Sequence, residues 1–396
     1  MLGIWMWADS VAACGADRVF DDCALIGVTD VFFLTKGLSG RCAFGTRLAP
    51  AMAEGSDLLS EAVKAAHARG MRLHAWFTSA QDKHWCAEHP ENGLYHLTQG
   101  RSDRVVSITE PEYARFTHDV IADMLKRYDV DGVHLDYIRY NHLLYGWSDS
   151  DLDRYAKQGA DTSRLRELVN KTFYGGETDK QAVFEAFRRG DKDVCALVRT
   201  RIENLCRFAD AVLEGVRQAR PGITLSAALM PEGAYDTVFA HLHYGQSYAE
   251  LAGRFDMILP MAYSFAYGMD SEWVKKVTQG AARFGAKVLT GLHAYDGATA
   301  LTLRRDADAA LEIEGAEGVC LFRYGAFVPA AVKADSLTVV NPTDVPVTEL
   351  EISNAAETQR VKVLIAPGER AEKPLPFAAD TLRAWSGEKE ICAYLG

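Results

Sequence analysis

The sequence predicts an α/β protein, a (β/α)8 barrel that is followed by a small all-β domain. Eight strand-like segments alternate with helical patterns over roughly 330 residues, which favours parallel strands closed into a barrel. No Gly-x-Gly-x-x-Gly turn follows the first strand, so an open dinucleotide-binding sheet is disfavoured. From about residue 335 the segments become short and β-rich, with proline and glycine between them. We therefore divide the chain into a barrel at 1–333 and a β-rich domain at 334–396.

The predicted strands are short runs of β-branched and aromatic residues bounded by turn residues. In chain order they cover 2–7, 28–35, 71–77, 131–140, 223–230, 255–263, 286–295 and 318–324. Helical patterns lie between them at 16–26, 57–69, 109–128, 199–219, 271–284 and 300–314. The helix at 109–128 is the best marked, because Thr109 and Glu112 fit a capping box and Pro111 lies in its first turn.

A long polar stretch separates the fourth strand from the next barrel helix. Residues 141–197 contain short helical patches and the pair Gly175-Gly176, so we interpret them as a helical insertion. Connections of this length within a compact domain usually have a function. The sequence therefore predicts a lid over the site.

The composition argues against several classes of partner. Acidic residues outnumber basic ones 54 to 43, and the formal charge of -11 disfavours nucleic acid or an anionic membrane as the partner. No apolar run approaches the roughly 20 residues that cross a bilayer, and the N-terminus lacks a secretory signal pattern. We expect a cytoplasmic protein, although a secreted protein whose signal is missing from the sequence would show the same pattern. Its oligomeric state is not predicted.

The cysteines indicate neither a disulfide framework nor a zinc site. All eight are dispersed, and none belongs to a Cys-x-x-Cys pair. We expect reduced, structural thiols, and no cofactor or metal is predicted.

The fourth strand carries the most informative motif, from Asp131 to Tyr140. Alternation places Gly132, His134 and Asp136 on one face of this strand. A carboxylate at the end of a buried strand is typical of active sites, and the alternative is that Asp136 caps the following helix. Because aromatic and ionisable residues end most of the other strands as well, we favour catalysis for Asp136, and a structural role for Asp131 at the strand start.

Active sites of (β/α)8 barrels lie at the carboxyl ends of the strands. Aromatic, acidic and hydrogen-bonding residues occupy these ends: Trp5, Trp7, Thr35, Lys36, His74, Trp76, His134, Asp136, Arg139, Glu232, Tyr263, His293, Tyr295, Asp296, Arg323 and Tyr324. This mixture suits a sugar, whose faces stack on aromatic rings and whose hydroxyls bind polar side chains. Glycosidic cleavage needs two carboxyl groups, for which we predict Asp136 and Glu232, with Asp296 in reserve.

The motif from Tyr128 to Tyr140 resembles the glycosyl-hydrolase-like family ten barrels, together with weaker matches at 245–248 and 256–263. The resemblance covers about 1–330 and implies a (β/α)8 fold that hydrolyses or binds a polysaccharide. Asn141 stands where these proteins often have proline.

The same motif is similar in part to the chitinase signature Asp-Gly-x-Asp-x-Asp-x-Glu. Asp131, Gly132 and Asp136 are in register with it, but His134 replaces the middle acid and Ile138 the catalytic Glu. Chitinase chemistry is therefore not expected.

We thus expect a glycoside hydrolase that cleaves a poly- or oligosaccharide with two carboxyl groups. The predicted substrate contacts are Trp76 by stacking, and His134, Arg139, Tyr263, His293, Asp296 and Arg323 through polar groups. For His134 and the aromatic rings, packing in the core is the alternative.

Two other functional hypotheses stay open. A barrel in which Asp136 lacks a second carboxylate would bind glycans without cleaving them. A metal-dependent hydrolase of the amidohydrolase type would use His74, His134, His293 and Asp296, but strand one lacks the His-x-His pair with which such sites usually begin.

Overall fold

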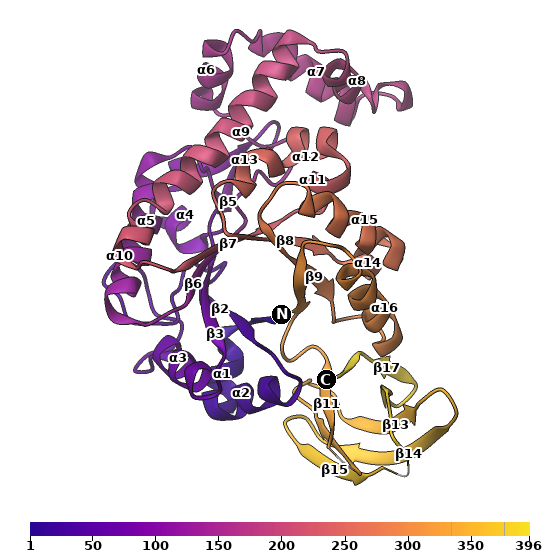
Figure 1. The fold of residues 1–396 in the computed structure, drawn as a ribbon. Helices are drawn as coiled ribbons and strands as arrows, with labels where there is room; N and C mark the ends of the chain where they lie inside the picture. The colour runs from indigo at the N-terminus through magenta and orange to yellow at the C-terminus, as the bar shows by residue number, and fades with distance from the viewer. Residues whose placement is uncertain (334, 376) are drawn as a thin grey trace.

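A computed structural model describes residues 1–333, 335–375 and 377–396 and contains the predicted barrel. Eight parallel strands close in the order β1-β10-β9-β8-β7-β6-β3-β2, and Figure 1 looks into this ring. They are β1 (Leu2–Met6), β2 (Asp30–Lys36), β3 (Arg72–Thr78), β6 (Gly132–Asp136), β7 (Thr224–Leu229), β8 (Met257–Ala262), β9 (Lys287–His293) and β10 (Ala316–Phe322). Each predicted strand is confirmed, with differences only at its ends.

Helices cover the outer wall of the ring (Figure 1). The main ones are α2 (Ala16–Leu25), α3 (Leu58–Ala68), α5 (Pro111–Arg127), α9 (Lys192–Val212), α15 (Ser271–Ala282) and α16 (Ala300–Leu311). Shorter helices are α1 (Ala8–Cys14), α4 (Lys83–Glu88), α10 (Val216–Ala219), α11 (Glu232–Tyr235), α12 (Thr237–Tyr244), α13 (Tyr248–Ala252) and α14 (Ser264–Tyr267). Helix α9 begins before the predicted residue 199, because the Asp191 side chain caps it by accepting from the Asp193 and Val194 N–H groups.

The strands pack apolar side chains on both faces. Val133 and Leu135 of β6 belong to the layer between the barrel and its helices. The barrel interior is filled by Trp5, Phe32, Trp76, Ala228, Met257, Leu259, Leu289 and Cys320. The alternation predicted for the fourth strand is thus confirmed, and it turns His134 and Asp136 inward.

Carboxylates at strand starts tie neighbouring strands together. Asp131 directly precedes β6, and its Oδ2 accepts the Leu73 N–H of β3 at 2.8 Å. Asp256 directly precedes β8 and in the same way accepts the Leu225 N–H of β7 at 2.9 Å. These bonds fix strand register at the end of the barrel opposite the expected site, which is the structural role expected of Asp131.

The insertion is helical and has its own apolar core. It contains α6 (Asp149–Lys157), α7 (Thr162–Tyr174), α8 (Ala182–Arg188) and the start of α9. Leu143, Trp147, Tyr155, Leu165, Val169, Val183, Val194 and Leu197 are buried within it. Figure 1 shows these helices beside the ring, joined to it through α9.

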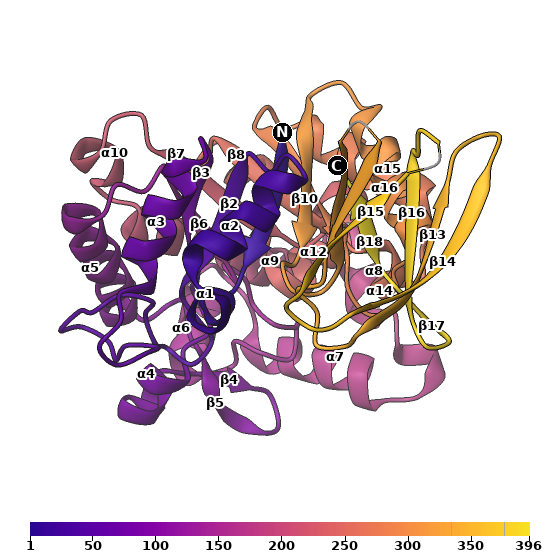
Figure 2. The same cartoon turned by 90° about the horizontal axis from the view of Figure 1, so that it is seen from below.

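An unpredicted hairpin, β4 (Gly93–His96) and β5 (Gly100–Val106), follows β3 and contacts the insertion. The Leu97 N–H donates to the Leu144 carbonyl at 2.8 Å. Figure 2 shows hairpin and insertion at one end of the barrel, and both follow the carboxyl ends of their strands. Within the described ranges, no helix has the length and apolar character needed to cross a membrane.

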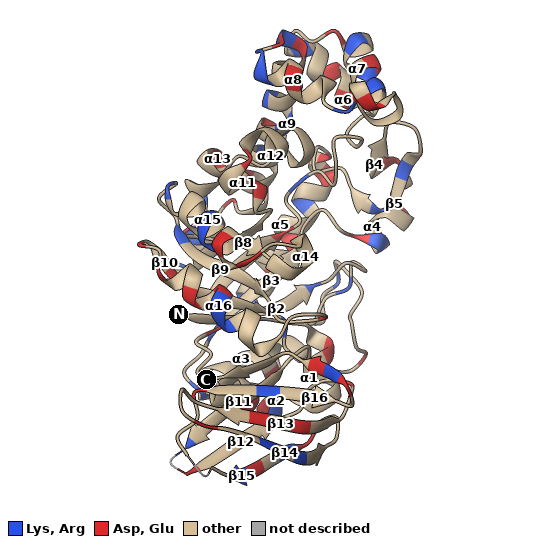
Figure 3. Ribbon diagram, turned by 90° about the vertical axis from the view of Figure 1, so that its right-hand side faces the viewer, with Lys and Arg blue, Asp and Glu red and all other residues tan. Residues whose placement is uncertain are grey.

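The C-terminal region forms two four-stranded sheets, β15-β12-β11-β18 and β14-β13-β16-β17. Their strands are β11 (Val328–Lys333), β12 (Ser336–Val340), β13 (Val347–Ser353), β14 (Thr358–Ile365), β15 (Arg370–Pro374), β16 (Thr381–Ser386), β17 (Lys389–Ile391) and β18 (Ala393–Leu395). Glu349 and Glu351 of β13 form ion pairs with Arg360 and Lys362 of β14, and Figure 3 shows red stretches of β13 beside blue stretches of β14. The all-β character predicted for this region is confirmed.

Gly132 provides the space that buried His74 occupies on the neighbouring strand. A Cβ at Gly132 would lie 2.1 Å from His74 Nδ1 and 2.9 Å from the Thr224 carbonyl oxygen. We expect Gly132→Ala to lower the free energy of unfolding by about 1–3 kcal/mol or more, because an overpacked core must shift its neighbours. Urea unfolding measures this, with Gly253→Ala, which meets nothing within 4 Å, as the control. Equal unfolding midpoints for the two variants would contradict the prediction.

Candidate active site

Asp136 ends β6 with its carboxyl group held by two donors. Its Oδ2 accepts from Trp76 Nε1 at 3.2 Å, and its Oδ1 accepts from the Tyr137 N–H at 2.6 Å. The residue is only 7% exposed. Burial raises the pKa of the Asp136 carboxyl to about 6, although Arg139 and the two donors act in the opposite direction. An appreciable fraction of Asp136 is therefore protonated near neutral pH.

The backbone turns sharply directly after this carboxyl group. Tyr137 has a φ of 56°, in the left-handed region that residues with a Cβ rarely adopt. The chain turns tightly here: the Tyr137 N–H donates to Asp136 Oδ1, and the Arg139 N–H donates to the Tyr137 carbonyl at 2.9 Å. Strained backbone of this kind is common at functional sites.

Glu232 is the first residue of α11, just beyond β7, and is also 7% exposed. Its Oε1 accepts from the hydroxyls of Tyr244 at 3.4 Å and Tyr267 at 3.3 Å. Its Oε2 is buried and has no hydrogen-bond partner among the described residues. Burial raises the pKa of Glu232, while the two tyrosines and the charge of Arg139 lower it.

Arg139 lies within electrostatic range of both carboxyl groups, since its charge lowers the pKa of Asp136 and of Glu232. Its guanidinium carbon is 5.0 Å from the ring centre of Tyr137 and 5.8 Å from that of Tyr244. Its Nε is buried without a hydrogen-bond partner in the described part of the chain. Buried polar atoms are normally bonded, so these unfilled positions on Arg139 and Glu232 suit the hydroxyl groups of a ligand.

Trp76 and His134 lie in the barrel interior on the side of Asp136. Trp76 is 4% exposed and donates to Asp136, so it supports that carboxyl group rather than presenting a face for stacking. His134 is completely buried; its Nε2 accepts from Trp5 Nε1 at 3.2 Å, and its Nδ1 lies 2.9 Å from Ser226 Oγ. Burial also lowers the pKa of His134 far below its usual value. We reassign both residues from substrate contact to support of the site.

Aromatic rings gather at the ends of β8, β9 and β10. The ring centre of Tyr263 is 6.2 Å from that of His293 and 5.5 Å from that of Phe322. The His293 ring stacks on Tyr295 at 3.7 Å, and Phe265, which is 53% exposed, lies 5.5 Å from His293. Burial and the charge of Asp136 both raise the pKa of Tyr263, so this group adjoins the first carboxyl group.

Asp296 and Arg323 lie toward the C-terminal sheets. The Asp296 side chain is 91% exposed and pairs with Lys389 at 3.7 Å, so it lacks the burial of the other two acids. Arg323 stacks on Trp7 with 3.5 Å between its guanidinium carbon and the ring centre. Trp7 is 37% exposed at the end of β1, where one side of its ring faces the guanidinium.

The residues of the metal alternative do not converge. His74 Nε2 is bound to Asp30 Oδ1 at 2.9 Å near the strand starts, and both ring nitrogens of His134 have partners in the barrel. Among the described residues, no group of three or more His, Cys, Asp or Glu side chains is arranged to hold a metal ion.

Sequence reasoning missed two residues of the site, Tyr244 and Tyr267. Both reach Glu232 from short helices beyond the strand ends, α12 and α14. A tyrosine at the end of such a short helix carries no periodic signal that would show which strand end its hydroxyl meets.

Comparisons with known proteins agree with this fold. A sequence profile described as Glycosyl hydrolase-like 10 matches residues 46–296, more than half of the chain. The glycoside hydrolase domain of PgaB (BpsB) from Bordetella bronchiseptica is similar, with a TM-score of 0.60 at 15% identity over 81% of this chain and 93% of that one. No curated protein matches the sequence.

Two larger enzymes share the fold over part of their length. A β-galactosidase from the psychrophilic Marinomonas ef1 has a TM-score of 0.59 at 12% identity, over 82% of this chain and 54% of that one. The α-L-fucosidase isoenzyme 2 of Paenibacillus thiaminolyticus has a TM-score of 0.56 at 14% identity, over 81% of this chain and 46% of that one. This chain thus spans about half of each, and at such identities the likeness concerns the fold alone.

Proposed function

Since the chain belongs to the glycosyl hydrolase-like 10 family, we propose that it cleaves a poly- or oligosaccharide with Asp136 and Glu232 as its two carboxyl groups. One observation carries the proposal. Two buried carboxyl groups with raised pKa values follow neighbouring strands, β6 and β7, within range of one arginine. Glycosidic cleavage needs a pair of carboxyl groups on either side of the bond that breaks.

We assign the general acid to Asp136. A pKa near 6 leaves this group partly protonated near neutral pH, and burial is the cause, as in other carboxylic acids that protonate leaving groups. In the reaction, Asp136 gives its proton to the glycosidic oxygen while the bond from that oxygen to the anomeric carbon breaks.

Glu232 takes the second role. Two phenol hydroxyls hold its Oε1, while Oε2 has no partner among the described residues and is left to act on the substrate. Arg139 favours the ionised form of Glu232. An ionised Oε2 either attacks the anomeric carbon or removes a proton from the water that does so, and the anomer first released identifies which.

The proposed substrate contacts surround this pair. Arg139, Tyr263, His293 and Arg323 offer polar groups for sugar hydroxyls, and the exposed ring of Phe265 offers a face for stacking. Asp296, which is exposed and paired with Lys389, is the most peripheral of the proposed contacts.

We expect Glu232→Gln to lower kcat by about 10²–10⁴-fold, because the amide can neither attack the anomeric carbon nor accept a proton. The amide oxygen still accepts from Tyr244 and Tyr267, so the fold should persist. Hydrolysis of an oligosaccharide panel, followed through new reducing ends, measures the change. Glu272→Gln, at an exposed acid in the first turn of α15, is the control.

Three outcomes of this experiment are informative. A Glu232→Gln variant with wild-type kcat would remove Glu232 from the mechanism. A wild-type protein that binds members of the panel but cleaves none would be a glycan-binding barrel. A wild-type protein that neither binds nor cleaves any of them would contradict the proposed substrate class.

A further inference from the structure

Arg201 of helix α9 is a completely buried cation without a carboxylate partner. The residue is 0% exposed, and the hydrogen bonds that its guanidinium makes with described residues go to backbone carbonyls, not to a carboxylate. Buried charges are costly unless they are paired and hydrogen-bonded. A buried arginine that is held by other means therefore needs a specific explanation.

Three backbone carbonyls take the place of a counter-ion. Arg201 Nη1 donates to the Tyr145 carbonyl at 2.8 Å, and Nη2 donates to the carbonyls of His142 at 3.1 Å and His243 at 2.9 Å. The guanidinium carbon also lies 3.8 Å from the ring centre of Tyr140. Carbonyl dipoles and the face of an aromatic ring both stabilise a cation.

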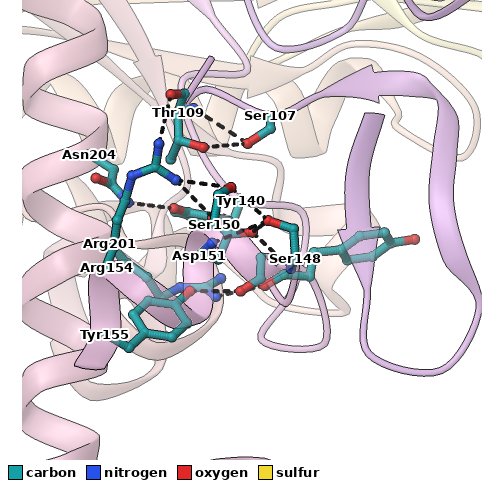
Figure 4. Close-up of polar contacts among 12 residues, drawn as sticks. Ser107, Thr109, Tyr140, Ser148, Ser150, Asp151, Arg154, Tyr155, Arg201 and Asn204 are labelled. Atoms are coloured by element: carbon teal, nitrogen blue, oxygen red, sulfur yellow. Dashed lines mark hydrogen bonds and ion pairs between the residues drawn. The ribbon is translucent and has the colours of Figure 1, made fainter. Parts of the chain in front are cut away.

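These contacts join the two loops that carry the catalytic candidates. Tyr140, His142 and Tyr145 follow β6 and Asp136, whereas His243 belongs to α12, beyond β7 and Glu232. Figure 4 shows Arg201 and Asn204 extending from α9 toward Tyr140, whose hydroxyl accepts from Asn204 Nδ2 at 3.1 Å.

The neighbours of these residues reach the site itself. The Tyr140 N–H donates to the Tyr244 carbonyl at 3.0 Å, and the Tyr244 hydroxyl donates to Glu232. Tyr140 directly follows Arg139, whose charge acts on both carboxyl groups. A displacement of the Tyr140 backbone would therefore move Arg139 and Tyr244 together.

We propose that Arg201 is a positioning residue of the glycosidase site, which sets the relative placement of Arg139 and Tyr244 by binding carbonyls on both loops. The inference rests on the proposed function of Asp136 and Glu232. Helix α9 begins in the insertion, and its barrel part thereby supplies a side chain that the site requires.

Arginine is the side chain that this position requires. Its planar fork offers donors in two directions and its flat face stacks on Tyr140. Lysine carries the same charge on a single nitrogen, which cannot reach both loops and stack at once. Arg201→Lys therefore tests the geometry of the fork separately from the charge, which Arg201→Met removes.

We expect both variants to lower kcat by about 100-fold with KM changed less than threefold, because a shift of about 1 Å at a catalytic group has an effect of this order. The pH profile of kcat/KM should also move to higher pH in both. Arg139 lowers the pKa of Asp136 and Glu232, so its displacement lets both values rise. A purely structural residue would change stability without moving this profile.

The matched control is Arg199→Met, an exposed arginine two residues earlier on α9 that forms no ion pair within the described ranges. Circular dichroism first shows which variants fold. If Arg201→Met does not fold, Arg201→Lys carries the test. Folded Arg201 variants with wild-type kcat and an unmoved pH profile overturn the positioning role, whatever their thermal stability. If the wild type itself cleaves no saccharide, it is the proposed function that fails, and the Arg201 variants are not needed to show it.

Discussion

An Asp136→Asn variant is expected to lose about 10²–10⁴-fold in kcat on any saccharide that the wild type cleaves, because the amide has no acidic proton for the leaving oxygen. Asparagine has nearly the same shape and its oxygen still accepts from the Tyr137 N–H, so the fold should persist although the bond from Trp76 Nε1 is lost. Kinetics on the best substrate of the panel measure the loss. Asp153→Asn, at an exposed residue of α6, is the control, and full activity in Asp136→Asn would remove Asp136 from catalysis.

The same substitution should change how stability depends on pH. The pKa of Asp136 rises from 3.8 to about 6 on folding, so the folded chain binds more protons than the unfolded chain between these values. The stability that Asp136 contributes is therefore complete below about pH 3.8 and is lost as the pH rises through 6. A shift of about two pKa units corresponds to roughly 3 kcal/mol.

Urea unfolding of both proteins between pH 4 and pH 8 tests this linkage without any substrate. We expect the wild type to lose stability relative to Asp136→Asn over this range, with the change centred between the two pKa values. The difference between the two proteins cancels the contributions of all other ionisable groups. A difference that stays constant with pH would show that burial does not raise the pKa of Asp136.

The second large effect concerns the buried ion pair between Lys36 and Asp82. Lys36 Nζ lies 2.6 Å from Asp82 Oδ2, and both side chains are 1% exposed. Burial lowers the pKa of Lys36, but Tyr113 and Asp82 raise it more, so the lysine remains charged. We expect Lys36→Met to lower the free energy of unfolding by about 3–5 kcal/mol, because it leaves the Asp82 charge buried and unpaired.

Denaturant unfolding of single and double variants separates the pair from its parts. Lys36→Met combined with Asp82→Asn should be more stable than Lys36→Met alone, since no unpaired charge is left buried. Asparagine still accepts the Trp85 N–H that begins α4. Lys83→Met, at the exposed neighbour of Asp82, is the control. Additive effects of the two substitutions would show that the two side chains are not coupled.

The strands could be predicted because each is a short run of apolar residues, and these runs alternate with helical patterns along the chain. The motif around Asp136 was informative for the same reason, since alternation alone turned His134 and Asp136 to one face. The hairpin at 93–106 was missed because its second strand, Gly100–Val106, is largely exposed and lacks that pattern. Whether an exposed segment forms a strand depends more on the strand it pairs with than on its own amino-acid composition.

The site was less predictable than the fold, since its residues meet through register and loop geometry. Trp76 supports Asp136 because β3 and β6 pair Trp76 with His134 and Thr78 with Asp136. This register cannot be derived from the sequence. Tyr244 and Arg201 depend on where α12 and α9 lie against the barrel. Arg199 and Arg201 lie on the same helix. No periodic pattern in the sequence shows that Arg201, and not Arg199, is buried against the loop that follows β6.

The left-handed backbone at Tyr137 bears on when the catalytic geometry is established. A side chain in this conformation raises the free energy of the folded chain by about 1–3 kcal/mol, and the rest of the barrel compensates for it. The turn is part of the folded barrel, in which the Tyr137 N–H donates to Asp136 Oδ1. The work of preorganising the acid is therefore done once, during folding, and is not repeated in each turnover.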